Sequence, residues 1–337
     1  MTAPLGIAVN PASGKDIRRL VARASVFDNQ EKRAIVRRAL VGAIHAGAQE
    51  VRYLPDSHEI ARSALLEVED ALSAEAVDAP RTGSVLDTVA GARALADAGC
   101  GAVLTLGGDG TNRAFVLGWR DAPLLPISTG TNNVFPVLVE ATLAGAAAGL
   151  VTSGRIPLAE AADRAKAISV TVEGEHDDIA LIDAVVTAER FVGSRALLAG
   201  EMLRLALLTR ADPAAAGITS IGGLVRPLGV DEDCGLLLEL GPKGDPVAAP
   251  IAPGLYQTIG VEATRVLAFD EDVEVTGPCV LAFDGERERV LKPGQMALLR
   301  LARNGPWVID VARTMRLAAE RGLYRLDGAA RSKRSAG

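Results

Sequence analysis

The sequence predicts an α/β N-terminal domain, a parallel sheet with helices on both faces, followed by an antiparallel β-sandwich-like domain. Up to about Leu150, short apolar runs typical of buried strands alternate with longer segments whose apolar residues recur at helical spacing. After about Gly154, strand-like runs follow one another and are separated by Gly, Pro and Asp. A glycine-rich loop directly follows one of the early strands, a place where α/β sheets commonly bind ligands.

The first part of the chain alternates strands with helices, and such crossovers make neighbouring strands parallel. Each expected strand is a short apolar run, and each expected helix has apolar helical periodicity or a capping turn such as Pro55-Asp56-Ser57. The strands are expected at Leu5–Val9, Val51–Leu54, Ala102–Leu106 and Pro123–Ile127, and the helices at Glu31–Ile44, up to Leu66, at Thr82–Ala98 and from Asn133 onward.

The second part is expected to be mainly strands, with one interrupting helix at Ala196–Thr209 and a final helix at Asp310–Gly322. We place the α/β domain at residues 1–154, the β-rich domain at 155–305, and a helix and tail that pack back on the first domain at 306–337. The strands are expected at Ile168–Val172, Ile179–Thr187, Gly235–Leu240, Val273–Val275, Val280–Phe283 and Met296–Leu301.

The bulk composition excludes several classes of protein. A formal net charge of −6 disfavours a nucleic-acid binder, whose phosphate contacts need a basic surface. The longest weakly polar run, Ala141–Val151, is shorter than the roughly 20 residues of a membrane-spanning helix. Three scattered cysteines, Cys100, Cys234 and Cys279, form neither a disulfide framework nor a metal-binding spacing. The start of the chain shows no secretory signal, so we expect a cytoplasmic protein without a membrane span.

The loop Gly107-Gly108-Asp109-Gly110-Thr111 carries the strongest chemical signal. Its three glycines permit positive φ and close approach of backbone N–H groups to a ligand, and Thr111 opens a helix whose N-terminus favours anions. These features predict a triphosphate site. A carboxylate there would repel phosphate unless it has a chemical task, so Asp109 could orient or deprotonate a hydroxyl, or help hold Mg²⁺. The alternative is a tight Asp-Gly turn between strand and helix.

A second polar loop, Ser128 to Asn133, follows the next expected strand and again precedes a helix. Its hydroxyls and amides suit a second wall of a phosphate site, although Asn132 or Asn133 would also serve as an ordinary helix cap. Because two successive strand ends carry such loops, we expect a ligand crevice at the carboxyl edge of the sheet.

These motifs resemble the NAD-kinase and diacylglycerol-kinase superfamily. The glycine loop, the Thr-Gly-Thr-Asn-Asn loop at Thr129–Asn133 and the later Phe283–Glu286 segment match its characteristic elements. The opening Ile7–Lys15 matches its first strand and Asn-Pro turn. The longer run from Asn10 to Lys32 resembles the ATP-NAD kinase-like subgroup that includes acetoin catabolism protein X.

The resemblance implies ATP and Mg²⁺ as cofactors, an active site between the two domains, and a homo-oligomer. Asp109, Asp284 and Glu286 would then be catalytic, and Asp183 would bind the acceptor, although Asp284-Gly285 alone also fits a hairpin turn. The nucleotide would be bound by Asn10, Gly107, Gly108, Gly110, Thr111, Asn112, Thr129, Gly130, Thr131, Asn132 and Asn133.

The sequence departs from NAD kinases where those enzymes hold the dinucleotide. Ile182 stands in place of their asparagine, and Gly217–Gly223 replaces their Thr-rich loop. We therefore expect a kinase that transfers the γ-phosphoryl group of ATP to a hydroxyl acceptor, either NAD or, in preference to it, a small hydroxyl metabolite. The alternative is a nucleotide-binding accessory or regulatory protein on the same fold, for example one linked to acetoin catabolism.

Overall fold

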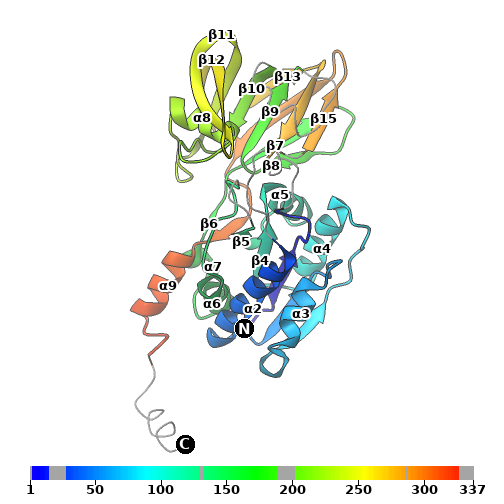
Figure 1. The fold of residues 1–337 in the computed structure, drawn as a ribbon, viewed down its shortest axis with the longest axis vertical. Coiled ribbons are helices and arrows are strands. Elements are labelled where there is room, and N and C mark those ends of the chain that lie inside the picture. Colours follow the sequence, from blue (N-terminus) through cyan, green and yellow to red (C-terminus); the bar gives the residue numbers. More distant parts are fainter. Residues whose placement is uncertain (1, 15–27, 130–132, 189–201, 286, 326–337) are drawn as a thin grey trace, which may run out of the picture.

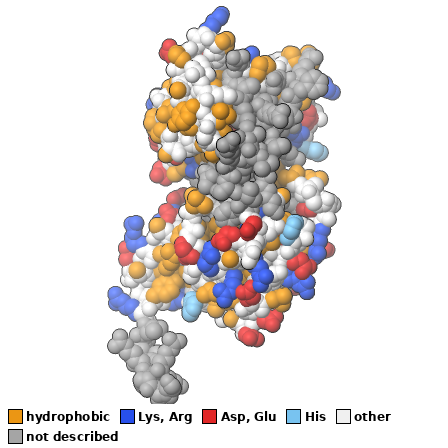
Figure 2. Space-filling model, viewed as in Figure 1, with side chains coloured by type: hydrophobic (Ala, Val, Ile, Leu, Met, Phe, Trp, Pro, Cys, Tyr) orange, Lys and Arg blue, Asp and Glu red, His pale blue; other side chains and the backbone are white. Residues whose placement is uncertain are grey.

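The computed structural model describes residues 2–14, 28–129, 133–188, 202–285 and 287–325. Figure 1 shows an α/β part, drawn at the bottom, and a part made mainly of strands above it. On the face drawn in Figure 2, acidic and basic side chains are interspersed over the α/β part rather than separated by sign.

The α/β part is built on a seven-stranded sheet in the order β3-β2-β1-β4-β5-β17-β6. Neighbouring strands are parallel except for the last pair, β17 and β6. The central strands are buried along their whole length, as expected for a sheet covered on both faces. The strands are β1 Leu5–Val9, β2 Glu50–Tyr53, β3 Ser73–Ala76, β4 Ala102–Gly107, β5 Pro123–Ser128, β6 Ala162–Arg164 and β17 Trp307–Ile309.

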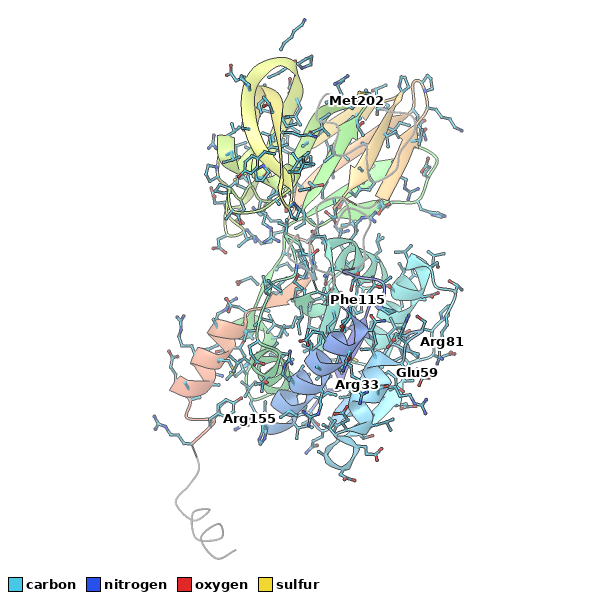
Figure 3. The ribbon with its side chains drawn as sticks, viewed as in Figure 1. Arg33, Glu59, Arg81, Phe115, Arg155 and Met202 are labelled. Atoms are coloured by element: carbon cyan, nitrogen blue, oxygen red, sulfur yellow. The ribbon has the colours of Figure 1, made fainter. Side chains whose placement is uncertain are left out.

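Helices cover both faces of this sheet, which confirms the predicted fold class. One hydrophobic core joins the sheet to α2, α3, α6 and α9, and a second joins it to α4 and α5. Figure 3 shows Phe115 of α5 inside this part, where it is fully buried. The helices are α2 Asn29–His45, α3 Ile60–Leu66, α4 Val85–Asp97, α5 Asp109–Gly118, α6 Ala141–Thr152, α7 Leu158–Ala161 and α9 Val311–Glu320, with a 3₁₀ turn at Glu69–Ala71.

The strand-rich part contains two antiparallel sheets. The six-stranded sheet has the order β12-β11-β10-β9-β14-β15 and the four-stranded sheet the order β13-β16-β7-β8. Val170 and Leu299 of the smaller sheet share a core with Val186 and Leu281 of the larger one, so the sheets pack face to face. The strands are β7 Ala167–Val172, β8 Asp178–Ala180, β9 Asp183–Thr187, β10 Leu203–Leu208, β11 Cys234–Ala252, β12 Leu255–Ala268, β13 Asp272–Thr276, β14 Cys279–Phe283, β15 Arg287–Leu291 and β16 Met296–Ala302, and α8 is Ile218–Val225.

Two helices predicted from the sequence are wrong. Leu203–Leu208, the described end of the expected helix at 196–209, is strand β10, because a short apolar run fits a buried strand as well as a helix. The helix expected from Asn133 begins only at Ala141. Pro136 disfavours helical conformation in the residue before it, and the N–H groups of Val134 and Phe135 bind a side chain instead.

The expected boundary at residue 154 stays a prediction. Strand β6, at Ala162–Arg164, lies beyond that boundary, yet β6 and β17 are both strands of the first sheet. Helix α9 then contacts α6 and α7. None of the helices in the described part of the chain is long and apolar enough to span a membrane.

Candidate active site

The glycine loop lies at the carboxyl end of β4 and starts helix α5 at Asp109. Gly108 has a φ of −98°, so the positive φ that glycine permits is not used there. Lack of room for a side chain is a better explanation for the glycine at position 107, because a Cβ on Gly107 would lie 2.5 Å from the Cβ of Thr111. Gly108 also has no side chain to cap the first turn of α5, which leaves backbone N–H groups there for a ligand.

Asn10 joins the end of β1 to this loop. Its backbone N–H donates to the carbonyl of Leu106 at 2.9 Å, and its Nδ2 donates to Oγ1 of Thr111 at 2.8 Å. Its Oδ1 accepts the N–H of Ala12. The structure therefore brings Asn10 and Thr111 together, as the sequence analysis expected.

Lys32 of α2 is fully buried beneath the turn that follows β1. Its Nζ donates to the carbonyl oxygens of Asn10 at 3.0 Å, Pro11 at 3.0 Å and Ser13 at 2.7 Å. A buried ammonium is tolerated only where such acceptors surround it. Lys32 was not expected to have a role, because its place on an otherwise amphipathic helix gives no sign of these contacts.

Asn112 is a structural part of the loop rather than an open ligand. The side chain is fully buried. Its Oδ1 accepts the hydroxyl of Thr105 at 2.6 Å, and its Nδ2 donates to the carbonyl of Gly108 at 2.9 Å. Both ends of the amide are therefore engaged within the protein, and the assignment of Asn112 to nucleotide binding stays a prediction that these bonds do not favour.

The second loop meets the first at the sheet edge, since Gly107 pairs with Ser128 in the register of β4 and β5. The hydroxyl of Thr129 donates to Oγ of Ser13 at 2.8 Å, and Nδ2 of Asn133 donates to Oγ of Ser128 at 2.8 Å. The other three residues expected to bind nucleotide there, Gly130, Thr131 and Asn132, lie outside the described residues.

Asp109 is bound by the backbone of the segment that follows the second loop. Its Oδ1 accepts the N–H groups of Val134 at 3.0 Å and Phe135 at 2.7 Å. Protein atoms surround the carboxylate on most sides, although the residue keeps partial access to solvent. The loss of solvation raises the pKa of Asp109 to about 7, and the charge of Asp284 acts in the same direction.

Asp284 is buried in the turn after β14 and has a φ of 49°. Its carboxylate accepts the N–H groups of Leu181, Ile182 and Asp183, at 2.8 to 3.2 Å. Burial raises the pKa of Asp284 above its usual range. Asp183 is also buried, and its carbonyl accepts the N–H of Asp284. The fourth predicted acidic residue, Glu286, lies outside the described residues.

Ile182, whose place suggested that NAD is a poor acceptor, points into the protein. Its side chain is buried in the core that also contains Phe115 and Leu181. It therefore presents no surface to a ligand, and the expected loss of a hydrogen bond to NAD at this position stays a prediction.

Arg210, which follows strand β10 after Thr209, is a site residue that was not expected from the sequence. Its Nη2 donates to the carbonyl of Val134, whose N–H group binds Asp109. Burial lowers the pKa of Arg210, while the charges of Asp109 and Asp284 oppose that shift. No signal in the sequence indicated Arg210, because the apolar run before it fits a helix as well as a strand.

The residues present fit a phosphate group better than a resident metal ion. The first turn of α5 offers backbone donors, and Asp109 is the acidic residue beside it. Within the described ranges, no three His, Cys, Asp or Glu side chains cluster closely enough to hold a metal. A magnesium ion would therefore be held largely by the phosphate oxygens.

Two protein-family models match separate parts of the chain. Residues 5–156 match the ATP-NAD kinase N-terminal domain, and residues 166–304 match the acetoin catabolism protein X C-terminal domain. Among solved structures, yeast NADH kinase complexed with NADH is 12% identical, with a TM-score of 0.47 over 97% of this chain and 89% of that one. A putative diacylglycerol kinase from Bacillus anthracis is 13% identical, with a TM-score of 0.48 over 91% of this chain and 98% of that one.

Those TM-scores are low, so the fold assignment depends on the sheet topology described above. A curated relative is much more similar in sequence. Acetoin catabolism protein X of Cupriavidus necator is 37% identical over 342 residues, which cover 95% of this chain and 94% of that protein. The chain therefore belongs to the family of acetoin catabolism protein X.

Proposed function

We propose that the chain is an ATP-dependent phosphotransferase whose acceptor is a hydroxyl group. The observation that carries this proposal is the position of Asp109, a carboxylate with a pKa of about 7 in the first turn of a helix that begins at a glycine loop. A general base works best when its pKa lies near the working pH. A carboxylate with an ordinary pKa would be a weaker base for a hydroxyl.

Asp109 accepts the proton of the acceptor hydroxyl in this proposal. The oxygen then forms a bond to the γ-phosphorus, the bond from that phosphorus to the bridging oxygen breaks, and ADP leaves with the electron pair. The N–H groups at the start of α5 stabilise the charge of the phosphates. Asn10 and Lys32 fix the turn that faces them. A bound Mg²⁺ would supply further neutralisation of phosphate charge.

The acceptor is proposed to be a small hydroxyl metabolite rather than NAD, on the ground that this chain lacks the asparagine and the Thr-rich loop of NAD kinases. A cytoplasmic homo-oligomer completes the proposal. Light scattering at micromolar concentration would test the oligomer, and a monomer would remove it.

A nucleotide-binding accessory role is the second candidate. The observation that favours it is that backbone N–H groups bind both acids, Asp109 and Asp284. Carboxylates that hold loops in place need no catalytic task. In this case the protein would bind ATP without turning it over.

The decisive experiment is incubation with ATP, Mg²⁺ and a panel of NAD, diols, acetoin and lipids, with ADP and phosphorylated product measured together. We expect acceptor-dependent ADP release in the native protein. Asp109→Asn should keep ATP binding and lose most of this transfer, by roughly 10²-fold or more. Arg37→Met on the outer side of α2 is the matched control and should leave transfer unchanged. ATP binding without product from any acceptor would favour the accessory role.

A further inference from the structure

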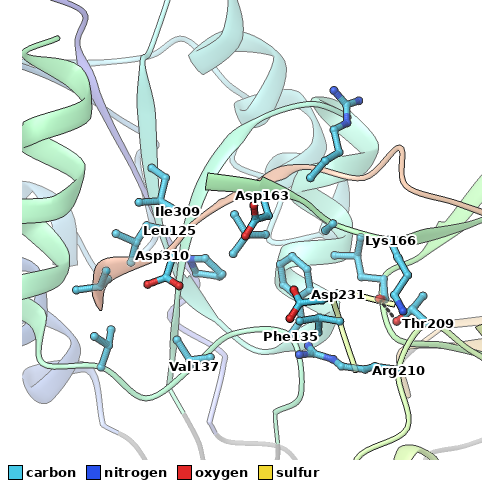
Figure 4. A pocket seen from close by; sticks show the side chains of 18 of the residues that line it. Leu125, Phe135, Val137, Asp163, Lys166, Thr209, Arg210, Asp231, Ile309 and Asp310 are labelled. Carbon is cyan, nitrogen blue, oxygen red and sulfur yellow. Dashed lines mark hydrogen bonds between the residues drawn. The ribbon is translucent and has the colours of Figure 1, made fainter. Parts of the chain in front are cut away.

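A cavity of about 450 Å³ lies beside the proposed active site and has no assigned role. It is bounded by the end of β5, the segment after the second loop, β6 and the start of α9. Figure 4 shows Leu125, Ile309 and Asp310 at one end and Lys166, Thr209 and Arg210 at the other. Its volume falls within the range of small-molecule sites in proteins.

Most of the cavity wall is apolar. Leu125, Phe135, Val308 and Ile309 line it, and Val137, whose side chain is 53% exposed, lies at its edge. Such a wall favours an aliphatic or aromatic body, since burying apolar surface is the main gain on binding. It gives little reason for a purely polar ligand such as a free sugar to bind.

Arg210 supplies a cationic end to this apolar cavity. One nitrogen of its guanidinium, Nη2, donates to the carbonyl of Val134. The Arg210 side chain also lines the cavity, as Figure 4 shows. Guanidinium N–H pairs of this kind match the two oxygens of a carboxylate.

The other cationic side chains of the wall are already engaged. Lys166 donates to the carbonyls of Gly229, Glu232 and Cys234, at 2.9 to 3.0 Å, which uses all three of its protons. Arg303 pairs with Asp233 at 2.6 Å, and Arg164 lies 5.7 Å from the ring centre of Trp307. Of the three acidic residues of the wall, Asp163 pairs with Arg313 and Asp310 caps α9, whereas Asp231 lies at the same end of the cavity as Arg210.

We propose that this cavity binds an organic carboxylate with an apolar body, and that Arg210 pairs with its carboxylate. The ligand would lie next to the site of transfer, because Arg210 and Asp109 bind opposite sides of the same residue, Val134. The inference rests on the proposed function only in one respect: if the chain is a phosphotransferase, this carboxylate belongs to the hydroxyl acceptor.

Binding of benzoate compared with benzamide tests the charge requirement without ATP or turnover. These probes share a ring and differ in the anion, so calorimetric titration of the native protein should show benzoate binding at least about tenfold more tightly. Arg210→Met should remove this preference, Arg210→Lys should keep part of it, and Arg37→Met should keep all of it. Equal binding of the two probes to the native protein would overturn the proposal.

A second variant locates the binding without touching Arg210. Val137→Trp fills the edge of the cavity from an exposed position and should weaken benzoate binding by about tenfold or more. Undiminished benzoate binding in a folded Val137→Trp protein would place the ligand elsewhere and overturn the proposal. If the protein binds benzoate but transfers no phosphate, the cavity proposal is supported and only the proposed phosphotransferase activity is contradicted.

Discussion

The surroundings of Asp109 act on the pKa of its carboxyl group in opposite directions. The N–H groups of Val134 and Phe135 and the charge of Arg210 favour its ionised form, whereas burial and Asp284 favour the neutral form. Burial is the largest of these effects, and the resulting pKa of about 7 makes the ionisation state of Asp109 sensitive to pH near neutrality.

Phosphoryl transfer should therefore increase as the pH rises through about 7 and level off above it. Asp109 can accept a proton only when it is ionised, so the acidic limb of kcat/KM against pH reports its pKa in the free protein. Initial rates between pH 5.5 and 9 with a fixed acceptor would measure that limb. A rate that stays level across this range would contradict a role for Asp109 as the base.

The contribution of Asp109 to the free energy of unfolding should fall, not rise, as the pH increases. Because folding raises the pKa of Asp109, the stability linked to its proton is fully present below its unfolded value of about 3.8 and is lost as pH rises through about 7. Asp109→Asn lacks this proton. The free energy of unfolding of the native protein, relative to the variant, should fall by on the order of 2–4 kcal/mol between pH 4 and 8. Urea titrations would measure this, and a constant difference would count against the raised pKa.

Single residues of the site were only partly predictable. Asn10, Asp109 and Thr111 come together as their motifs indicated, because strand ends of a parallel sheet meet at one edge. Lys32 and Arg210 were not predictable, since each acts through a backbone carbonyl of a segment remote in sequence. A motif records side-chain identity and gives no information on such contacts.

Glycines determine how closely the elements of the α/β part approach one another. Helices α2 and α6 cross with almost no side chain between them: a Cβ on Gly145 would lie 1.8 Å from the carbonyl oxygen of Ala39, and one on Gly42 would lie 1.9 Å from that of Thr142. Both contacts are with backbone, which cannot rotate away as a side chain can. The two helices must therefore separate if either glycine gains a side chain.

Gly145→Ala should lower the free energy of unfolding by on the order of 1–3 kcal/mol, because the added methyl group overpacks the α2–α6 contact. Gly229→Ala is the matched control: its new Cβ would meet nothing closer than 3.6 Å, and we expect a change within about 0.5 kcal/mol. Urea unfolding of both variants would measure the difference, and equal stability would show that the helices adjust freely.

The glycine loop gives a similar comparison for nucleotide binding. Gly107→Ala places a methyl group 2.5 Å from the Cβ of Thr111 and should displace the first turn of α5, weakening ATP binding by about tenfold or more. Gly108→Ala approaches only the Oδ1 of Asn133, at 3.0 Å, and that side chain can give way. Titration with a non-hydrolysable ATP analogue would separate the two variants. If Gly107→Ala weakens binding of the analogue less than Gly108→Ala does, the explanation from the Gly107–Thr111 contact is wrong.

Elements were more predictable than residues wherever one periodicity dominated. Strand β1, at Leu5–Val9, has the bounds that its apolar run indicated, and α2, α4 and α9 lie within a few residues of their expected ranges. Prediction failed at β10, whose apolar sequence suits either element. Only the start of β11 was expected and β12 was missed, because their long antiparallel pairing depends on partners that a local pattern does not specify.

At the scale of the molecule, a buried ion pair joins helix α5 to the strand-rich part. Arg113 of α5 donates to Asp178 at the start of β8 and to the carbonyl of Ile179, and both charged side chains are almost fully buried. Arg289 of β15 binds the second oxygen of Asp178 at 3.1 Å. The guanidinium of Arg113 also lies 5.3 Å from the ring centre of Phe283, one residue before Asp284. The helix that carries Asp109 is thus held against the turn that carries Asp284.

Removing the charge of Arg113 should destabilise the whole chain, because the buried Asp178 then keeps only Arg289 as a cationic partner. Arg113→Met should lower the free energy of unfolding by about 3–5 kcal/mol, whereas Arg300→Met, which breaks the exposed pair with Asp272, should cost less than about 1 kcal/mol. Arg113→Met should also separate unfolding of the α/β part from that of the strand-rich part, since this pair is one of the contacts between them. Differential scanning calorimetry would then show two transitions in place of one. A single transition with native stability would mean that apolar packing of Leu181 and Ile182 against the α5 side of the sheet holds the two parts together without the ion pair.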